Sequence, residues 1–425
     1  MNTGAIHMNK ISLIVAGAGS RGAGYAGYAL ARPEEAKIVG VAEPREFHRK
    51  KMATEHAIPE DAVFTDWQVM VARPKFADAV IIATQDRMHT EPAIAFIKKG
   101  YHVLLEKPMA PNEAECRAIV AEANKAEKIF GVCHVMRYTR YTRALKKMVS
   151  DGIIGDIVSI QHLEPVGWWH QAHSYVRGNW RNEKISSSML LAKSCHDMDW
   201  IRHIMGLKCL RVSSFGSLKH FRKEEQPKGA GDRCLACPND IEAKCPYSAM
   251  KLYLSMIKDG KAEWPVDVIT DDLTESGVTE ALRTGPYGRC VYACDNDVVD
   301  NQVVIMEYEG GRTASFTMTA FTPFSDRITK VFGTHGALYG NGSQIEHHNF
   351  VTHENSIIDT EASQSGILGG HGGGDLGLME SYISALRHND PSLILSGPNE
   401  SLETHLIVFA TEQARKENRI IQVKL

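Results

Sequence analysis

The sequence ISLIVAGAGSRG, residues 11–22, decides the fold of the N-terminal part of the chain. The apolar run from Ile11 to Ala16 is rich in β-branched residues and predicts a buried strand. Gly17, Gly19 and Gly22 follow in G-x-G-x-x-G spacing at the start of a helical pattern. The first glycine permits a tight turn, the second lets a pyrophosphate approach the backbone, and the third allows close packing of helix and strand. The segment therefore predicts a dinucleotide-binding βα unit; the alternative is a glycine-rich turn without a ligand.

An acidic residue follows at the position where a bound dinucleotide presents its ribose. Glu43 lies 21 residues after Gly22, at the end of the second predicted strand, Lys37 to Ala42. A carboxylate there accepts hydrogen bonds from the ribose hydroxyls and repels the 2′-phosphate of NADP. We therefore expect NAD rather than NADP, although Arg45 and Arg49 lie close enough in the sequence to soften that preference.

The first third of the chain alternates predicted strands with helical patterns. Apolar runs at Ala79–Ala83, His102–Leu105 and Ile129–Cys133 predict further strands. Such alternation is typical of a parallel, doubly wound sheet covered on both faces. Residues 1–135 are therefore expected to form an α/β Rossmann domain that binds NAD.

The pattern changes after about residue 136. Period-two runs at Gln302–Tyr308 and Thr313–Phe321, joined by a Gly-Gly turn, predict an antiparallel hairpin. Residues 186–205 predict a single helix, and two further helical patterns close the chain. We therefore expect residues 136–425 to form an α+β domain, with the C-terminal segment able to pack back on the first domain.

Composition excludes several classes of protein. Of the 425 residues, 43% are hydrophobic and 23% are charged, and the formal net charge is −3, which argues against disorder and against binding of nucleic acid through bulk charge. No run of about 18 apolar residues predicts a membrane span, and the N-terminus lacks the apolar core of a secretion signal. The odd number of cysteines, nine, indicates reduced thiols. We expect a cytoplasmic protein.

A lysine stands at the end of a predicted strand. Glu106-Lys107-Pro108 follows the strand His102–Leu105, and ligands of open parallel sheets bind outside the carboxyl ends of the strands. Beside a cofactor, a lysine can donate to a substrate oxygen and stabilise a developing alkoxide. By position alone, Lys107 can equally be a solvated lysine before a turn proline.

Together these features resemble the glucose–fructose oxidoreductase and inositol dehydrogenase family, Gfo/Idh/MocA, over essentially the whole chain. Ala83-Thr84-Gln85, with His89 following, also resembles the nucleotide-side loop of that family. The resemblance implies a second domain that carries the substrate pocket and a large, mostly antiparallel open sheet through which homodimers or homotetramers form. The residues expected at the cofactor are Gly17, Gly19, Ser20, Arg21, Gly22, Glu43, Thr84, His89, Glu106 and Lys107.

The resemblance also implies a catalytic histidine. The stretch from Ser186 to Asp199 matches the family's Asp-x-x-x-His helix, and His196 falls on the histidine that accepts the proton of the substrate hydroxyl. A histidine suits this role because its pKa lies near neutrality. The chain departs from the family pattern at Ala192, where the family has the first aspartate. Asp199 or Asp197 is therefore expected to orient His196.

Candidate substrate contacts surround this helix. The segment from Gly167 to Arg181 interleaves aromatic residues with hydrogen-bonding residues, which suits stacking on sugar rings and pairing with hydroxyls, although the tryptophans can also be core anchors. A glycine-rich loop before a helix carries His371, which can close over a substrate, and Asp375, which suits an N-cap. The candidates are Arg137, Tyr138, His173, Tyr175, Trp180, Arg181, Lys193, Asp199 and His371.

Three cysteines cluster in the irregular part of the chain. Cys234 and Cys237 form a C-x2-C pair, and Cys245 follows eight residues later. A structural zinc is one interpretation, but zinc usually takes four ligands, and Cys290, Cys294 or a histidine could each be the fourth. Free or disulfide-capable thiols and iron–sulfur ligation are the alternatives.

The sequence therefore predicts an NAD-dependent oxidoreductase that acts on a hydroxyl or ketone of a sugar, glycoside or polyol. Lys107 would polarise the oxygen and His196 would act as acid and base. One alternative is an NAD-dependent glycosidase with transient oxidation and no net redox change. Another is a non-catalytic dinucleotide-binding regulator. The expected partner is a small carbohydrate, with neither a nucleic acid nor a membrane involved.

Overall fold

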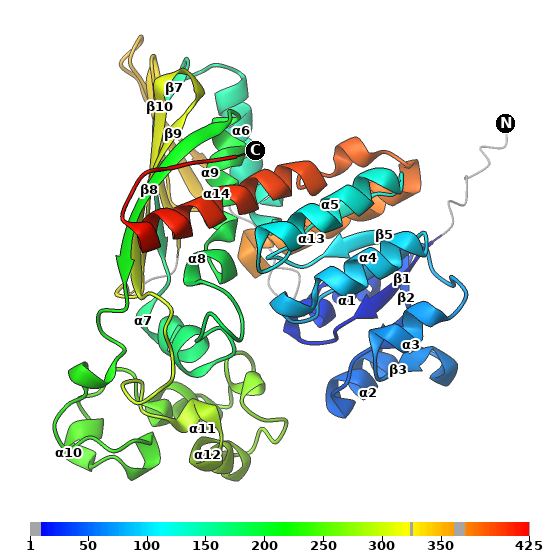
Figure 1. Ribbon diagram of the computed structural model, residues 1–425, viewed down its shortest axis with the longest axis vertical. Coiled ribbons are helices and arrows are strands. Elements are labelled where there is room, and N and C mark those ends of the chain that lie inside the picture. The colour runs from blue at the N-terminus through cyan, green and yellow to red at the C-terminus, as the bar shows by residue number, and fades with distance from the viewer. Residues whose placement is uncertain (1–9, 324–325, 361–369, 425) are drawn as a thin grey trace.

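Two sheets organise the chain. The computed structural model describes residues 10–323, 326–360 and 370–424. A six-stranded sheet with helices on both faces forms one body, and a nine-stranded sheet forms the second (Figure 1). Within the described part of the chain, no helix has both the length and the apolar character required to cross a membrane.

The six-stranded sheet is entirely parallel, in the order β3-β2-β1-β4-β5-β6, as the alternating pattern predicts. Its strands are β1 Ile11–Ala16, β2 Ala36–Ala42, β3 Val63–Phe64, β4 Ala79–Ile82, β5 His102–Leu105 and β6 Phe130–Val132. Its connecting helices are α1 Ser20–Ala31, α2 Glu46–Glu55, α3 Trp67–Ala72, α4 Thr90–Lys98 and α5 Glu113–Lys125. The strand order reverses between β1 and β4, which is where doubly wound sheets bind their ligands.

The core of this sheet explains why its strands are continuous apolar runs. Every residue of β4 is fully buried, because helices cover both faces of the sheet. The helix α13, Gly370–His388, contributes Leu378, Met379, Tyr382 and Ile383 to this core. A segment from the end of the chain therefore completes the packing of the first body.

The nine-stranded sheet has the order β14-β13-β12-β11-β7-β10-β9-β8-β15. Only the β7–β10 pair is parallel among the described strands of this sheet, so the expectation of a mostly antiparallel sheet is confirmed. The strands are β7 Ile157–Pro165, β8 Cys209–Ser217, β9 Asn301–Tyr308, β10 Arg312–Thr319, β11 Ile328–Gly333, β12 Gly336–Gly340, β13 Gln344–Asn349, β14 Asn355–Asp359 and β15 Ile421–Gln422. The helices beside it are α6 Arg140–Ser150, α7 Trp168–His170, α8 Met189–Ala192, α9 Cys195–Met205 and α14 Pro398–Glu417.

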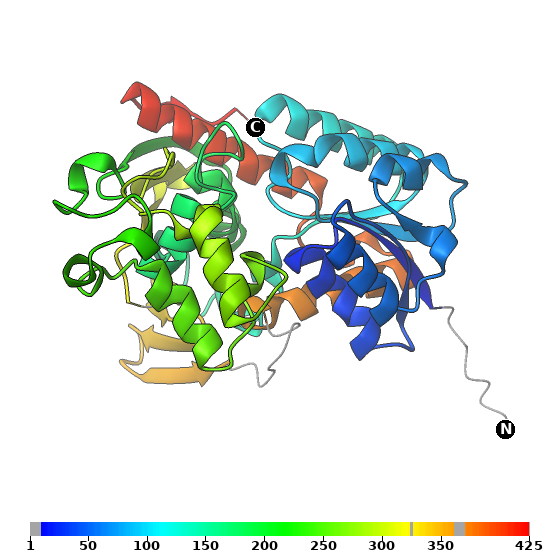
Figure 2. The same cartoon turned by 90° about the horizontal axis from the view of Figure 1, so that it is seen from below.

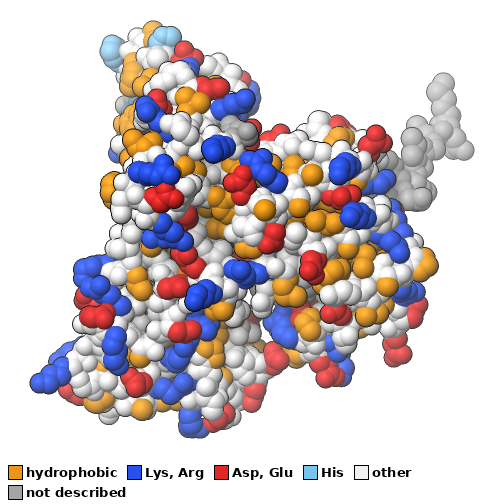
Figure 3. All heavy atoms as spheres, viewed as in Figure 1, with side chains coloured by type: hydrophobic (Ala, Val, Ile, Leu, Met, Phe, Trp, Pro, Cys, Tyr) orange, Lys and Arg blue, Asp and Glu red, His pale blue; other side chains and the backbone are white. Residues whose placement is uncertain are grey.

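The two faces of this sheet differ. Inward residues such as Val304 and Met306 of β9 are fully buried beneath α9 and α14. On the other face Phe215, Val303 and Ile305 are 70%, 41% and 50% exposed, and the strand register places Phe215 opposite Val303. We call this the open face of the sheet. Figure 3 shows hydrophobic side chains along the side of the molecule where the sheet is seen edge-on.

Residues 218–300 form a separate lobe between β8 and β9, here called the insert (Figures 1 and 2). Its helices are α10 Asn239–Glu242, α11 Ser255–Lys258 and α12 Glu275–Thr284. The insert packs against the π-helical turn Gln171–Arg177 of the second body.

The single helix expected over residues 186–205 is wrong. The structure breaks it at Lys193 and Ser194, which form a turn between α8 and α9. A contact with a distant segment accompanies this break, and the local sequence pattern does not reveal it. The Ala192 carbonyl oxygen at the end of α8 accepts a hydrogen bond from Lys107.

Candidate functional site

The glycine turn after β1 has no room for side chains. Gly17 has a φ of +95°, and a Cβ there would lie 2.4 Å from the Ala83 oxygen. A Cβ on Gly22 would lie 1.9 Å from the Gly17 oxygen. A Cβ on Gly19 would meet only the flexible end of the Arg45 side chain, at 3.1 Å. The turn therefore has the shape that a pyrophosphate above the N-terminus of α1 requires.

Glu43 lies against this turn. Its carboxylate accepts a hydrogen bond from the Ala18 N–H at 2.8 Å and pairs with the Arg45 guanidinium at 2.7 Å. Burial alone would raise the pKa of Glu43, but the hydrogen bonds from Arg45 and Ala18 hold that pKa below its ordinary value. The carboxylate is thus ionised where the ribose of a dinucleotide would lie.

Arg21 connects the glycine turn to two other segments. Its guanidinium pairs with Glu106 at 2.7 Å and with Asp375 of α13 at 2.6 Å. The Glu106 carboxylate also accepts a hydrogen bond from the Tyr25 hydroxyl. The sequence suggests that Asp375 caps the N-terminus of a helix. In the structure Asp375 lies near the start of α13, and its carboxylate forms an ion pair with Arg21. Ser20, the remaining candidate of the turn, is exposed at the start of α1.

His89 supports the loop that carries Lys107. Its two ring nitrogens lie 2.7 Å from the Pro108 oxygen and 3.0 Å from the Thr84 oxygen. The Thr84 hydroxyl donates to the Met88 oxygen. His89 is 1% exposed, and its two ring contacts join the loops that follow β4 and β5.

Lys107 reaches from the first body to the helix pair of the second. Its Nζ donates a hydrogen bond of 2.8 Å to the Ala192 oxygen. In a continuous helix this oxygen would accept the N–H four residues later, that of His196. The break after α8 therefore leaves a carbonyl free to hold Lys107 one turn before His196.

His196 is 4% exposed, and its Nδ1 has no hydrogen-bond partner. Its ring centroid lies 5.4 Å from that of His371 and 6.0 Å from that of His134. Burial, and then the nearby Lys107 ammonium, lower the pKa of His196 well below the ordinary value for histidine. The imidazole is therefore neutral at pH 7 and can accept a proton.

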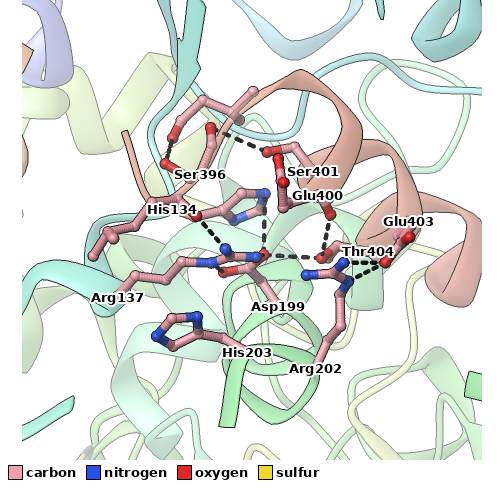
Figure 4. Close-up of polar contacts among 12 residues, drawn as sticks. His134, Arg137, Asp199, Arg202, His203, Ser396, Glu400, Ser401, Glu403 and Thr404 are labelled. Atoms are coloured by element: carbon pink, nitrogen blue, oxygen red, sulfur yellow. Dashed lines mark hydrogen bonds and ion pairs between the residues drawn. The ribbon is translucent and has the colours of Figure 1, made fainter. Parts of the chain in front are cut away.

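The two aspartates expected to orient His196 face elsewhere. Asp199 forms a two-pronged ion pair with Arg137, at 2.6 and 2.7 Å, and accepts a 2.8 Å hydrogen bond from Thr404 (Figure 4). Asp197 pairs with Arg327 at 2.5 Å and with His162 at 3.1 Å. The expected orienting role is wrong, because neither carboxylate forms a hydrogen bond with His196.

Arg137 and Tyr138 use their polar groups inside the protein. Besides Asp199, Arg137 donates to the Leu395 oxygen, and the Tyr138 hydroxyl bonds Ser396. Both side chains are at most 2% exposed. The structure thus places Arg137, Tyr138 and Asp199 in a buried network that fixes the chain before α14, with no free polar group for a substrate.

A second ionic network lies beside α9 and was missed in the sequence. Glu164, at the end of β7, is fully buried and pairs with Lys193 at 3.1 Å and with Arg327 at 2.9 Å. Arg327 also pairs with Asp197, so the network links β7, α9 and the segment before β11. The charge of Lys193 is already paired here. Glu164 and Arg327 belong to no recognisable sequence motif. The only local signal is the alternation of buried and exposed side chains along β7, which points Glu164 inward.

The aromatic segment after β7 divides between two roles. His173 is buried and bonds the Tyr253 hydroxyl of the insert at 3.0 Å, and Arg181 pairs with Asp295 at 2.8 Å. Trp180, which is 38% exposed, donates to Asp86 of the first body at 3.1 Å. Tyr175 lies between them, buried, with its ring 6.3 Å from that of Trp180. The segment therefore joins the insert to the loop after β4.

The expected zinc site is not supported. No three His, Cys, Asp or Glu side chains within residues 10–323, 326–360 and 370–424 are grouped to hold a metal ion. All nine cysteines are free thiols.

Comparison with known proteins agrees with the fold and the glycine turn. Residues 11–134 match the model of an oxidoreductase family with an NAD-binding Rossmann fold, and residues 146–425 match the model of its C-terminal alpha/beta domain. The chain belongs to the Gfo/Idh/MocA oxidoreductase family. It is thus an NAD-binding oxidoreductase, and the resemblance inferred from Glu-Lys-Pro and the glycine turn is confirmed.

Individual members of the family are distant. The chain is 25% identical to the oxidoreductase YteT of Bacillus subtilis over 365 residues, 80% of each chain. It is 27% identical to myo-inositol 2-dehydrogenase of Thermotoga maritima over 187 residues, 44% of this chain and 52% of the relative. A solved levoglucosan dehydrogenase, in complex with NADH and levoglucosan, superposes with a TM-score of 0.70 at 16% identity, covering 98% of this chain and 100% of the other. That likeness shows the shared fold.

The buried histidines predict how stability depends on pH. Burial lowers the pKa of His134 to about 3, so on acidification the unfolded chain binds a proton before the folded chain does. This stability is present above the unfolded pKa of about 6.5 and is lost as pH falls below it, at about 1.4 kcal/mol per pH unit for each such group. We expect urea unfolding between about pH 6.5 and pH 5 to show a shallower slope of stability against pH for His134→Leu than for the unmodified chain. Equal slopes would contradict a neutral, buried His134.

Proposed function

We propose that this protein transfers a hydride between NAD and a secondary hydroxyl or ketone of a sugar, glycoside or polyol. The observation that carries the proposal is the placement of Lys107 beside the helix of His196, which joins a cation from the first body to a neutral base in the second. The names of relatives that act on inositol and levoglucosan support a polyhydroxylated substrate.

The residues of the glycine turn fit the dinucleotide. Gly17 and Gly22 exclude side chains from the turn, and the N-terminus of α1 faces the place of the phosphates. Glu43 would accept hydrogen bonds from the ribose. When bound, the nicotinamide supplies the hydride acceptor for the carbinol carbon.

The chain's own groups then handle the oxygen and its proton. His196, neutral at pH 7, accepts the proton of the substrate hydroxyl at a ring nitrogen. The Lys107 ammonium donates to the same oxygen and stabilises the negative charge that develops there. The reverse reaction uses the same groups, with protonated His196 returning the proton to the alkoxide. We propose His371 as a substrate contact, because its side chain is one-third exposed and its ring lies 5.4 Å from that of His196.

Replacement of either group should slow turnover without unfolding the protein. We expect Lys107→Met and His196→Asn each to lower kcat by about 10²–10⁴-fold, the range typical of lost acid–base or electrostatic catalysis. Turnover is measured as NADH formed from a panel of sugars and polyols, and cofactor binding is followed by NADH fluorescence. Lys98→Met, which changes an exposed side chain of α4, serves as the control. Turnover that survives both replacements would exclude the assigned roles.

The same assay separates net oxidation from a redox-neutral reaction. Stoichiometric NADH on addition of substrate supports the dehydrogenase. Release of sugar from a glycoside with no net NADH would contradict it and favour the glycosidase with transient oxidation. Binding of NADH with no turnover of any substrate would favour a regulator.

We further propose a preference for NAD over NADP, set by Glu43. Glu43→Ser removes the negative charge and leaves Arg45, which is 57% exposed, free to meet a 2′-phosphate. We expect the ratio of kcat/KM for NADP to that for NAD to rise by about tenfold, equivalent to about 1.4 kcal/mol. The control is Glu46→Ser, a neighbouring exposed carboxylate that pairs with Lys50. An unchanged ratio in Glu43→Ser would show that Glu43 does not select the cofactor.

We also propose that the open face of the nine-stranded sheet is the homo-oligomer interface, as a dimer or tetramer. Contiguous exposed apolar residues on a sheet face favour burial against a second copy. We expect Phe215→Glu combined with Ile305→Glu to reduce the mass in solution, measured by light scattering, to that of one chain. Leu30→Glu, at an exposed apolar position of α1, should leave the mass unchanged. A single-chain mass for the unmodified protein would refute the interface.

A further inference from the structure

A small cavity in the insert brings four cysteines together. Its volume is about 30 Å³, and Cys234, Cys237, Cys245 and Cys290 line it with Arg177 of the π-helical turn. Three of these thiols come from the motif at residues 234–245, and Cys290 comes from the far end of the insert, after α12. Cys290 is thus the fourth cysteine, which the sequence left open, whereas Cys294 does not line the cavity.

The geometry does not suit a single metal ion. Zinc bound by four thiolates lies about 2.3 Å from each sulfur, which leaves no empty space at the centre. Here the four cysteines line a cavity with room for a water molecule, which needs about 10–15 Å³. No three of the described ligand-type side chains are grouped around one ion, and none of the four thiols is in a disulfide.

A buried positive charge faces the same thiols. Arg177 is 1% exposed, and none of the ion pairs formed by the described residues includes it. Its Nε and Nη2 donate to the carbonyl oxygens of Arg289 and Tyr247, and Nη2 also lies 3.5 Å from the Cys234 sulfur. Its Nη1 has no hydrogen-bond partner. A buried guanidinium without a carboxylate is costly unless another negative charge lies beside it.

Two N–H donors lie beside the Cys234 sulfur. The sulfur receives both the Arg177 contact and the Ala249 N–H, at 3.4 Å. Hydrogen bonds of this kind stabilise thiolate ligands of iron–sulfur clusters. Cys237 and Cys245 are each followed by proline, as is the last cysteine of the bacterial ferredoxin run.

We propose that Cys234, Cys237, Cys245 and Cys290 bind a [4Fe–4S] cluster in this cavity. The cluster fills the void that one ion would leave, and its four thiolates supply the negative charge that compensates Arg177. Its role is structural. It ties the two ends of the insert to the π-helical turn that carries His173 and Tyr175, and it takes no part in hydride transfer.

The test is the metal content of the intact protein. The full chain, expressed with sufficient iron and purified without oxygen, should contain about four irons and four acid-labile sulfides per chain. It should also show broad visible absorption that bleaches with dithionite. One zinc per chain in place of iron, or no metal even after reconstitution with ferrous iron and sulfide, would overturn the proposal. The measurement is independent of any dehydrogenase activity.

Single replacements identify the ligands. We expect Cys290→Ala and Cys237→Ala each to lose at least about half of the iron, as expected when one of four ligands is removed. Cys294→Ala is the matched control, because its thiol lies four residues from Cys290, donates to the Cys290 oxygen and is outside the cavity. It should retain the full iron content. Iron retained in both Cys290→Ala and Cys237→Ala, or lost equally in Cys294→Ala, would refute this ligand set.

Discussion

The hydrogen bond from Lys107 to the Ala192 oxygen is the contact on which the site depends. It joins the loop after β5 of the parallel sheet to the end of α8 in the second body. The loop of the donor, Lys107, is fixed because His89 contacts the carbonyl oxygen of the adjacent Pro108. The acceptor, the Ala192 oxygen, is available because the helix breaks before α9. Catalysis between two domains requires such a joint, since the reacting groups must be fixed to within a fraction of an ångström.

The carboxylates next to His196 in the sequence form ion pairs with other residues. Asp197 and Asp199 follow it closely in the sequence, but their carboxylates pair with Arg327 and Arg137. The pKa of Asp199 stays well below its ordinary value because the Arg137 attraction outweighs the effect of burial. With both carboxylates neutralised by arginines, burial and Lys107 keep His196 uncharged. His196 is therefore neutral chiefly because it is buried.

Several features were predictable because they depend on neighbours in sequence. The glycine spacing, the apolar runs and the distance to Glu43 gave the parallel sheet and the dinucleotide turn, since each reflects local backbone geometry. Strands β3, β8, β13 and β14 were not predicted. The strand β14 is exposed at every residue and has no apolar alternation, so pairing with β13 decides it.

The sequence by itself determined the Rossmann core and the family, and it singled out Lys107 and His196 as candidates. Tertiary structure alone decided the contacts around them: the break in the helix, the ion pairs of Glu164 with Lys193 and Arg327, and the hydrogen bond from Trp180 to Asp86. It also placed Cys290 beside a motif some 45 residues earlier in the chain. The physical reason is that backbone conformation follows from adjacent residues, whereas a buried charge or thiol takes its partner from whichever segment the fold brings within reach.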